Sequence, residues 1–303
     1  MDADPKHTPV LLSEVLSLLD PKAGETVLDA TLGLGGHAMK FLERIGAHGR
    51  LIGLDADAQN LAQAQQRFRS LPGHVECRHE NFRNIARLDL PEVDILFADL
   101  GLSSPHVDEP ERGFTFRADV ALDLRFDHTQ GLPAAEWLRK VSLDDLTRVF
   151  REYGELKSPR RLAGKLKESE VTTTFSVVRV VEAVFGWKAP SVMPQVFQAL
   201  RIAVNDEMSA LDALLAAGPL LLKPGGRMGV ISYHSLEDRR VKQVFRILST
   251  APQHPETGQD LHPADFALLT RKAVVPSGAE QESNARSRSA KLRVIMRRSS
   301  APS

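Results

Sequence analysis

The chain has 303 residues, 42% of them hydrophobic, and a formal net charge of zero at pH 7. That length suits one large domain or two smaller ones, with enough apolar content for a core. Zero net charge gives no bulk electrostatic reason to expect a nucleic-acid partner. The single cysteine, Cys77, excludes an internal disulfide and a cysteine-rich zinc site.

Nothing in the sequence indicates a membrane or an export signal. The N-terminus lacks a basic segment followed by an apolar one, and the apolar run 213–222 is too short to span a bilayer. We therefore expect a cytoplasmic protein without a membrane partner.

From the N-terminus to residue 99, predicted strands and helices alternate. A short helix at 13–19 precedes strands at 26–30, 50–54, 74–78 and 93–99, with helices at 36–45 and 58–69. In the helix at 58–69, Leu61, Ala64 and Phe68 share one face at helical spacing. Such alternation predicts a parallel sheet covered on both faces.

The alternation stops after Pro105. Residues 107–206 contain few convincing strands and five predicted helices, at 133–139, 142–153, 158–168, 174–185 and 194–204. Ser142, followed by Asp144 and Asp145, is a good N-cap with acids in the first helical turn. This stretch is predicted to be a helical insertion within the α/β domain.

The α/β pattern then resumes with a helix at 207–217, a tight turn at 223–226, a strand at 227–233 and a helix at 237–248. Two late strands, near 266–275 and 290–296, are expected to pair antiparallel at one edge of the sheet. The stretch 276–289, rich in Ser, Glu and Arg, is predicted to be a mobile loop.

The most informative segment is a glycine-rich turn after the first strand. Asp29 ends that strand, and Gly33, Gly35, Gly36 and His37 follow. Glycine lets the backbone come close to a ligand at the carboxyl end of a strand. The spacing lacks the third glycine of a dinucleotide motif, and no Walker sequence is present, so a nucleoside or an amino acid fits better than a pyrophosphate. A plain tight turn remains the alternative.

Two further strands also end in acids. Asp55 closes the second strand, where a carboxylate can take the hydroxyls of a ribose. Asp99 closes the fourth and runs into a turn that ends at Pro105. A carboxylate there can accept an N–H of a poorly nucleophilic exocyclic amine and direct the nitrogen lone pair. The alternative for Asp99 is a helix-capping or turn acid.

Other chemically capable residues give weaker signals. Phe82 could lie against an adenine ring, although core packing is the commoner fate of a phenylalanine. His37 and His106 flank the proposed site, but a lone histidine is more often structural. His234 and Ser235 suggest a hydrolase, yet the nucleophile-elbow motif is missing. No metal-binding spacing occurs, so no metal is predicted.

The C-terminal segment is basic. From Arg271 onward it carries eight lysines or arginines and two glutamates. A solvated terminus and a phosphate-contacting segment are both consistent with that charge.

Taken together, these motifs resemble one family, the bacterial 16S ribosomal RNA cytosine-N4 methyltransferases, which depend on S-adenosylmethionine. The matching blocks run nearly end to end and in order: 7–12, 29–37, 53–57, 99–105, 112–116, 122–125, 197–205, 232–239 and 288–294. The glycine turn alone would indicate only a Rossmann-like methyltransferase.

The resemblance implies an α/β fold, a Rossmann-like class I methyltransferase with a mostly parallel seven-stranded sheet and an inserted all-helical domain. Residues 1–106 and 207–303 would form the two parts of the methyltransferase domain, and 107–206 a substrate-recognition insertion. It implies cofactor contacts at Gly35, Gly36, His37, Asp55, Phe82 and Asp99. Gly33 and His106, which stands where the family has Gln, complete the predicted set.

The resemblance further implies methylation of a cytidine N4 in the decoding region of 16S ribosomal RNA, free or in the small subunit. Asp99 would orient the amine of a flipped-out base, with Ser103 and Ser104 shaping the base pocket. The predicted RNA contacts are Arg201, Arg286, Arg288, Lys291 and Arg293. For Arg201, an ion pair with Asp206 or Glu207 is an equal alternative.

One block departs from the family pattern. Residues 192–196 lack the His-Pro-Ala-Thr-Arg run of the family, including its arginine. Two rival functions remain: a DNA amino-methyltransferase, and an RNA-binding ribosome-assembly factor without turnover. The oligomeric state is left open, with a homodimer as one option.

Overall fold

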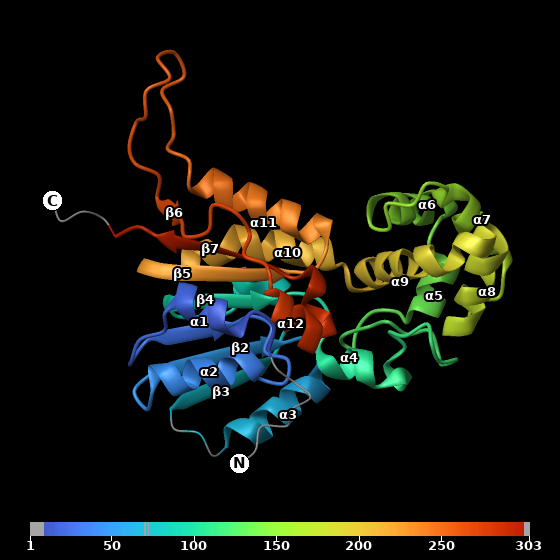
Figure 1. Cartoon of the computed structure of the whole chain (residues 1–303), viewed down its shortest axis with the longest axis horizontal. Helices are drawn as coiled ribbons and strands as arrows, with labels where there is room; N and C mark the ends of the chain where they lie inside the picture. The colour runs from blue at the N-terminus through green and yellow to red at the C-terminus, as the bar shows by residue number, and fades with distance from the viewer. Residues whose placement is uncertain (1–8, 70, 72, 300–303) are drawn as a thin grey trace. The chain divides into compact units, whose positions relative to one another are not determined.

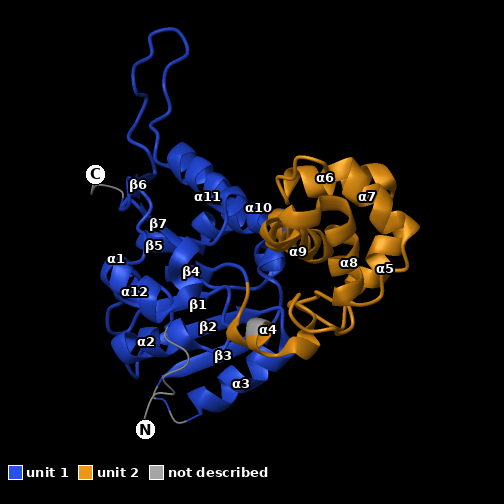
Figure 2. Cartoon of the chain, turned by 45° about the vertical axis from the view of Figure 1, so that its right-hand side comes forward, with its two compact units in different colours: residues 1–101, 209–303 blue, residues 102–208 orange. Residues whose placement is uncertain are grey.

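The computed structural model of the chain describes residues 9–69, 71 and 73–299, so His7 and Thr8 of the first family block lie outside the described residues. The chain divides into two compact units (Figure 2). Unit 1 comprises Met1–Gly101 and Ser209–Ser303, and unit 2 comprises Leu102–Met208.

Unit 1 is built on a seven-stranded sheet of order β3-β2-β1-β4-β5-β7-β6 (Figure 1). β1 to β5 are parallel, and β6 and β7 join antiparallel at one edge, which confirms the predicted fold class. The strands are β1 Thr26–Asp29, β2 Arg50–Asp55, β3 His74–His79, β4 Val93–Asp99, β5 Leu222–Ser232, β6 Phe266–Leu268 and β7 Lys291–Arg297.

Helices cover both faces of this sheet. One face packs against α1 Leu12–Leu19, α2 Gly36–Ile45 and α3 Ala58–Phe68, and the other against α10 Glu207–Ala217 and α11 Ser235–Leu248. Successive strand residues alternate between the two cores: Val27 belongs to the first and Leu28 to the second. The central strands are therefore apolar on both faces, as a doubly covered parallel sheet requires.

Unit 2 is helical, with one core of its own. Leu146, Phe150, Val181 and Leu200 are fully buried in it. Its helices are α4 Ser104–Asp108, α5 Ala134–Lys140, α6 Leu143–Glu152, α7 Pro159–Glu168, α8 Thr174–Phe185 and α9 Ala189–Asn205, with short 3-10 turns at Pro110–Arg112 and Gly186–Lys188. Ser142 caps α6, and its hydroxyl accepts the N–H of Asp145 at 3.0 Å.

The units divide at residues 101 and 208, whereas the sequence placed the boundaries at 106 and 206. The first difference has a clear cause. The ring of His106 packs on Phe114 and Phe126, with centroids 4.8 and 5.1 Å away, and this contact places α4 in unit 2. A turn after a strand gives no sequence signal for such a contact.

Three predicted elements are corrected. α9 begins at Ala189, not at 194, because Pro190 occupies its first turn and Pro194 is accommodated inside it. β6 ends at Leu268, well short of 275. The segment predicted as a mobile loop instead holds α12 Gly278–Ser283 and a 3-10 turn at Ala285–Ser289.

Capping explains why that segment is ordered. The Ser277 hydroxyl accepts the N–H of Glu280 at 3.2 Å, and Glu280 in turn accepts the N–H of Leu11 at 2.8 Å. Within the described part of the chain, no helix is both long enough and apolar enough to cross a bilayer.

Candidate active site

The turn between β1 and α2 strongly favours glycine. Gly33 and Gly35 have φ of 53° and 79°, in the left-handed region. A Cβ at Gly35 would lie 2.5 Å from Cζ of Phe68, and one at Gly36 would lie 2.9 Å from Cγ of Pro9. The turn is therefore held close to its neighbours by the absence of side chains.

Asp55, at the end of β2, is tied to this turn. Its Oδ2 accepts the N–H of Gly33 at 2.6 Å, and its Oδ1 accepts the N–H of Asp57 at 2.7 Å. Burial raises the pKa of Asp55 to about 6, against the lowering effect of these two hydrogen bonds. The sequence predicted Asp55 as a ligand contact and gave no sign that it also fixes the turn.

Asp29, the last residue of β1, is only 1% exposed and accepts the N–H of Thr31 at 3.1 Å. Burial raises its pKa to about 7, and the charges of Asp99 and Asp55 add to the increase. The sequence marked Asp29 as a strand-end acid without assigning it a contact.

Asp99 ends β4 and is held by two hydrogen bonds. Its N–H donates to Oγ1 of Thr31 at 2.6 Å, and its Oδ1 accepts the hydroxyl of Tyr233 at 2.8 Å. Its Oδ2 lies 3.7 Å from Nδ1 of His37. Burial raises the pKa of Asp99 to about 7. The carboxylate nevertheless remains 24% exposed, which leaves it open to a ligand.

His37, in the first turn of α2, is neutral. Burial lowers its pKa to about 4. Its Nε2 lies 2.9 Å from the carbonyl oxygen of Val10, which can only accept, so Nε2 carries the proton and Nδ1 presents a lone pair toward Asp99. His37 therefore supplies no positive charge to the carboxylates.

Phe82 begins the 3-10 turn Phe82–Arg87 that follows β3. The side-chain oxygen of Asn81 caps this turn by accepting the N–H of Arg83 at 2.9 Å. The Phe82 ring is half-buried and packs against the core on the α10 and α11 face of the sheet. Its predicted contact with the cofactor stays a prediction.

Ser103, Ser104 and His106 lie at the start of α4 in unit 2. Nδ1 of His106 accepts the N–H of Ser103 at 3.1 Å and lies 2.9 Å from its hydroxyl oxygen. The imidazole is 4% exposed and acts as a capping residue for α4. The predicted roles of these three residues, in the base pocket and in cofactor binding, are not tested by this geometry.

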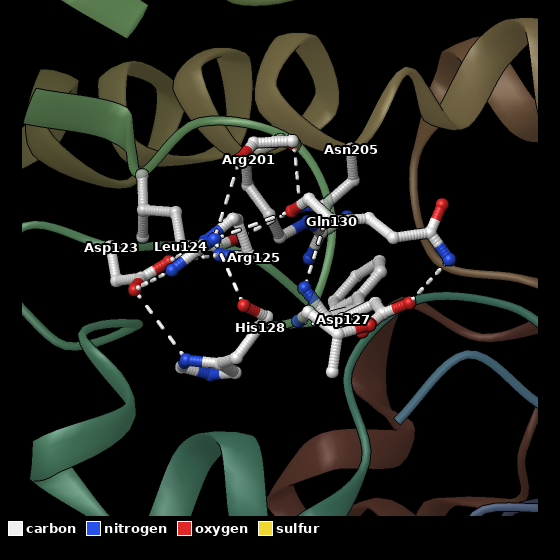
Figure 3. Close-up of polar contacts among 11 residues, drawn as sticks. Asp123, Leu124, Arg125, Asp127, His128, Gln130, Arg201 and Asn205 are labelled. Carbon is white, nitrogen blue, oxygen red and sulfur yellow. Dashed lines mark hydrogen bonds and ion pairs between the residues drawn. The ribbon is translucent and has the colours of Figure 1, made fainter. Parts of the chain in front are cut away.

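Two blocks of the family pattern, 122–125 and 197–205, meet within unit 2 in one polar network (Figure 3). The guanidinium of Arg125 donates to both Asp123 oxygens, at 2.7 and 2.8 Å, and to three backbone carbonyls of residues 128–131. The Asn205 amide donates to the Leu124 carbonyl at 2.7 Å and accepts the N–H of Phe126 at 2.8 Å. This network holds Leu124 in the left-handed region, at φ 63°.

The predicted RNA-contacting residues differ in how accessible they are. Arg201 makes a two-pronged ion pair with Glu207, at 2.7 and 3.0 Å, which is one of the alternatives foreseen for it. Arg293 lies 2.7 Å and Lys291 3.4 Å from Asp238. Arg286 is half-buried and Arg288 is exposed. Arg288 is therefore the best placed of the five to meet an external phosphate.

β2, β1 and β4 are neighbouring parallel strands. Their last residues, Asp55, Asp29 and Asp99, therefore lie at the same carboxyl-terminal end of the sheet, beside the glycine turn. Within residues 9–69, 71 and 73–299, no lysine or arginine forms an ion pair with these carboxylates. Such a set favours a cationic ligand with hydroxyl groups. A sulfonium nucleoside with an amino-acid tail has both features, so the residues present fit S-adenosylmethionine.

The comparisons with known proteins agree with this class. The MraW methylase family matches residues 4–298. A ribosomal RNA small subunit methyltransferase H from Syntrophotalea carbinolica is 42% identical, over 96% of this chain and 98% of its own length. The methyltransferase H of Myxococcus xanthus is 43% identical, over 97% and 98%.

Likeness to solved structures is weaker. An rRNA methylase from Streptococcus thermophilus aligns over 98% of this chain and 99% of its own at 12% identity, with a TM-score of 0.41.

The fold and the strand-end carboxylates define a Rossmann-like methyltransferase. The chain belongs to the MraW methylase family. The prediction of a methyltransferase that uses S-adenosylmethionine is thereby confirmed, and so is the family resemblance seen in the sequence.

Proposed function

We propose that this methyltransferase acts on ribosomal RNA and transfers a methyl group to the exocyclic N4 of a cytidine in the decoding region of 16S ribosomal RNA. Two relatives at 42% and 43% identity carry the name ribosomal RNA small subunit methyltransferase H. The target nitrogen is inferred from the chemistry available at Asp99 and from the sequence blocks that resemble the N4-cytosine family.

The observation that carries the proposal is the Asp99 carboxylate. It ends β4 beside the glycine turn, has no cationic partner among the described residues, and stays partly exposed. The cytosine amine is conjugated with its ring and is a poor nucleophile. By accepting one N–H, Asp99 would turn the nitrogen lone pair toward the methyl group.

S-adenosylmethionine, when bound, supplies a methyl group on a positively charged sulfur. Transfer of that methyl group to N4 would leave S-adenosylhomocysteine as the second product. The amine then gives up one proton, which the Asp99 carboxylate would accept. Ser103 and Ser104, four and five residues further along the chain, would help to hold the flipped-out base.

The test is methylation of defined substrates with isotopically labelled S-adenosylmethionine. Purified protein is incubated with free 16S ribosomal RNA, with small subunits, and with duplex DNA of mixed sequence, and labelled nucleosides are mapped by mass spectrometry. We expect N4-methylcytidine at one position of the RNA. Label in DNA alone would favour a DNA amino-methyltransferase, and RNA binding without label would favour an assembly factor.

A further inference from the structure

We propose that Tyr233 is a positioning residue for methyl transfer: its hydroxyl holds one oxygen of Asp99 so that the other faces the substrate amine. This inference rests on the proposed function of Asp99. The Tyr233 hydroxyl donates to Oδ1 of Asp99 at 2.8 Å. Oδ2 is then the oxygen left to accept an N–H.

The backbone of Tyr233 is fixed by the sheet and by α11. β5 pairs with β4 so that Ile231 lies opposite Asp99, and the Leu100 N–H donates to the Ile231 carbonyl at 3.0 Å. Tyr233 is two residues beyond Ile231. Its N–H donates to Oε2 of Glu237 at 2.8 Å, and Glu237 is 2% exposed. These contacts fix the backbone of Tyr233 and so hold its ring beside Asp99.

The ring is also packed in place. Gly101 has φ of 93°, and a Cβ there would lie 3.4 Å from Cδ2 of Tyr233. The ring thus lies over the turn that follows Asp99. The same hydroxyl bond links the ends of β4 and β5, so rotation of the Asp99 carboxylate would break it.

The bond also favours the ionised form of Asp99. The groups around this carboxylate are Asp29 from β1, neutral His37 from α2 and Glu237 from α11, with Glu280 of α12 acting on Tyr233. None of these groups is a cation. Burial and Glu237 raise the pKa of Asp99, and the hydrogen bond from the Tyr233 hydroxyl lowers it. Loss of the hydroxyl should therefore raise that pKa further.

Tyr233→Phe tests this role, because it removes the hydroxyl and keeps the ring. The matched control is Tyr153→Phe, at the C-terminal end of α6. Tyr153 and Tyr233 are the two tyrosines of the chain. Single-turnover rates are measured against pH with saturating S-adenosylmethionine and RNA. We expect a fall of about 10-fold in the rate for Tyr233→Phe, and a rise of about one unit in the midpoint of its acid limb. Affinity for S-adenosylhomocysteine should not change.

A second readout needs no activity. With ¹³C-labelled aspartate, the Asp99 carboxyl resonance, assigned with Asp99→Asn, is titrated in the ligand-free protein. Its midpoint should rise in Tyr233→Phe and stay constant in Tyr153→Phe. If Tyr233→Phe does not fold, the ¹³Cζ chemical shift of Tyr233 is compared between the wild type and Asp99→Asn. We expect the two shifts to differ.

The outcomes separate the two proposals. A wild-type protein that methylates cytidine, with a Tyr233→Phe variant whose pH profile and Asp99 titration are both unchanged, overturns the role of Tyr233 alone. A wild-type protein that does not methylate RNA cytidine, but whose Asp99 titration responds to Tyr233→Phe, overturns the proposed function and leaves the Tyr233–Asp99 coupling intact.

Discussion

Buried and half-buried carboxylates have different partners in the two units. In unit 2, Asp123 lies against Arg125 and Glu207 against Arg201, each through two hydrogen bonds. In unit 1, Asp29, Asp55 and Asp99 gather beside the glycine turn, and no lysine or arginine of the described residues pairs with them.

The pKa values follow this difference. Burial raises the pKa of all three unit 1 carboxyls, to between about 6 and about 7. Burial also acts on Asp123, but the hydrogen bonds and charge of Arg125 outweigh it and the pKa is lowered. Paired charges are expected to give unit 2 a defined scaffold, whereas uncompensated charges are expected to cost stability in unit 1, as at the binding site that we propose there.

The largest effect is expected at Asp99. Asp99→Asn keeps the shape of the side chain and removes its charge, so methyl transfer should fall about 1,000-fold, within the range for a lost general base. The free energy of unfolding should stay constant or rise, because an uncompensated buried charge is removed. Single-turnover kinetics and thermal melts measure the two effects. Asp89→Asn, at an exposed position, is the control. Loss of both activity and stability would contradict the contrast between the units.

The matching experiment in unit 2 breaks a paired charge. Arg125 is 15% exposed, so Arg125→Met removes the guanidinium that pairs with the half-buried Asp123 and should cost about 3 kcal/mol of unfolding free energy. Both tryptophans, Trp137 and Trp187, belong to unit 2, so their fluorescence in denaturant reports this unit. Arg139→Met, at a 76% exposed position, should have little effect. Equal losses in the two variants would mean that the network is not the scaffold.

The glycine turn can be tested with a matched pair. Gly35 and Gly24 both have positive φ, but only at Gly35 would a Cβ clash, with the Phe68 ring. Gly35→Ala should therefore destabilise the fold through backbone strain and, through the clash, by a further amount of about 1–3 kcal/mol. It should also weaken S-adenosylhomocysteine binding. Gly24→Ala should introduce the backbone strain alone and bind S-adenosylhomocysteine normally. Calorimetry of binding measures the difference, and equal affinities would remove the turn from the site.

A further effect is expected on the pH dependence of stability. The pKa of Asp29 is about 7 in the fold against its ordinary value of 3.8, so the folded protein binds this proton more tightly than the unfolded chain does. Its contribution to stability is full at low pH and is lost as pH rises through about 7. Asp29→Asn should flatten this decline in melting temperature between about pH 4 and pH 8. An unchanged slope would mean that Asp29 is not the titrating group.

Local patterns in the sequence located most of the elements. The helices at 36–45 and 174–185 and the strand at 93–99 have the predicted bounds, because each has a strong period and a clear start or stop. The start of α9 was predicted wrongly at Pro194, because proline is usually found in the first turn of a helix. In the structure, Pro194 lies inside α9. The composition of the segment around α12 predicted a mobile loop. In the structure, the Ser277 cap and the Glu280–Leu11 contact order it.

The sequence by itself determined the alternating α/β architecture, the glycine turn and the strand-end carboxylates, because periodicity and glycine spacing are local properties of a chain. Only the tertiary structure decided which groups surround those carboxylates. Tyr233 lies 134 residues from Asp99, and Arg125 and Asn205 lie 80 residues apart, yet sheet register and helix packing bring each set together. Side-chain pairing over such separations leaves no periodic signal, so the uncompensated charge in unit 1 and the paired charge in unit 2 become visible only in the fold.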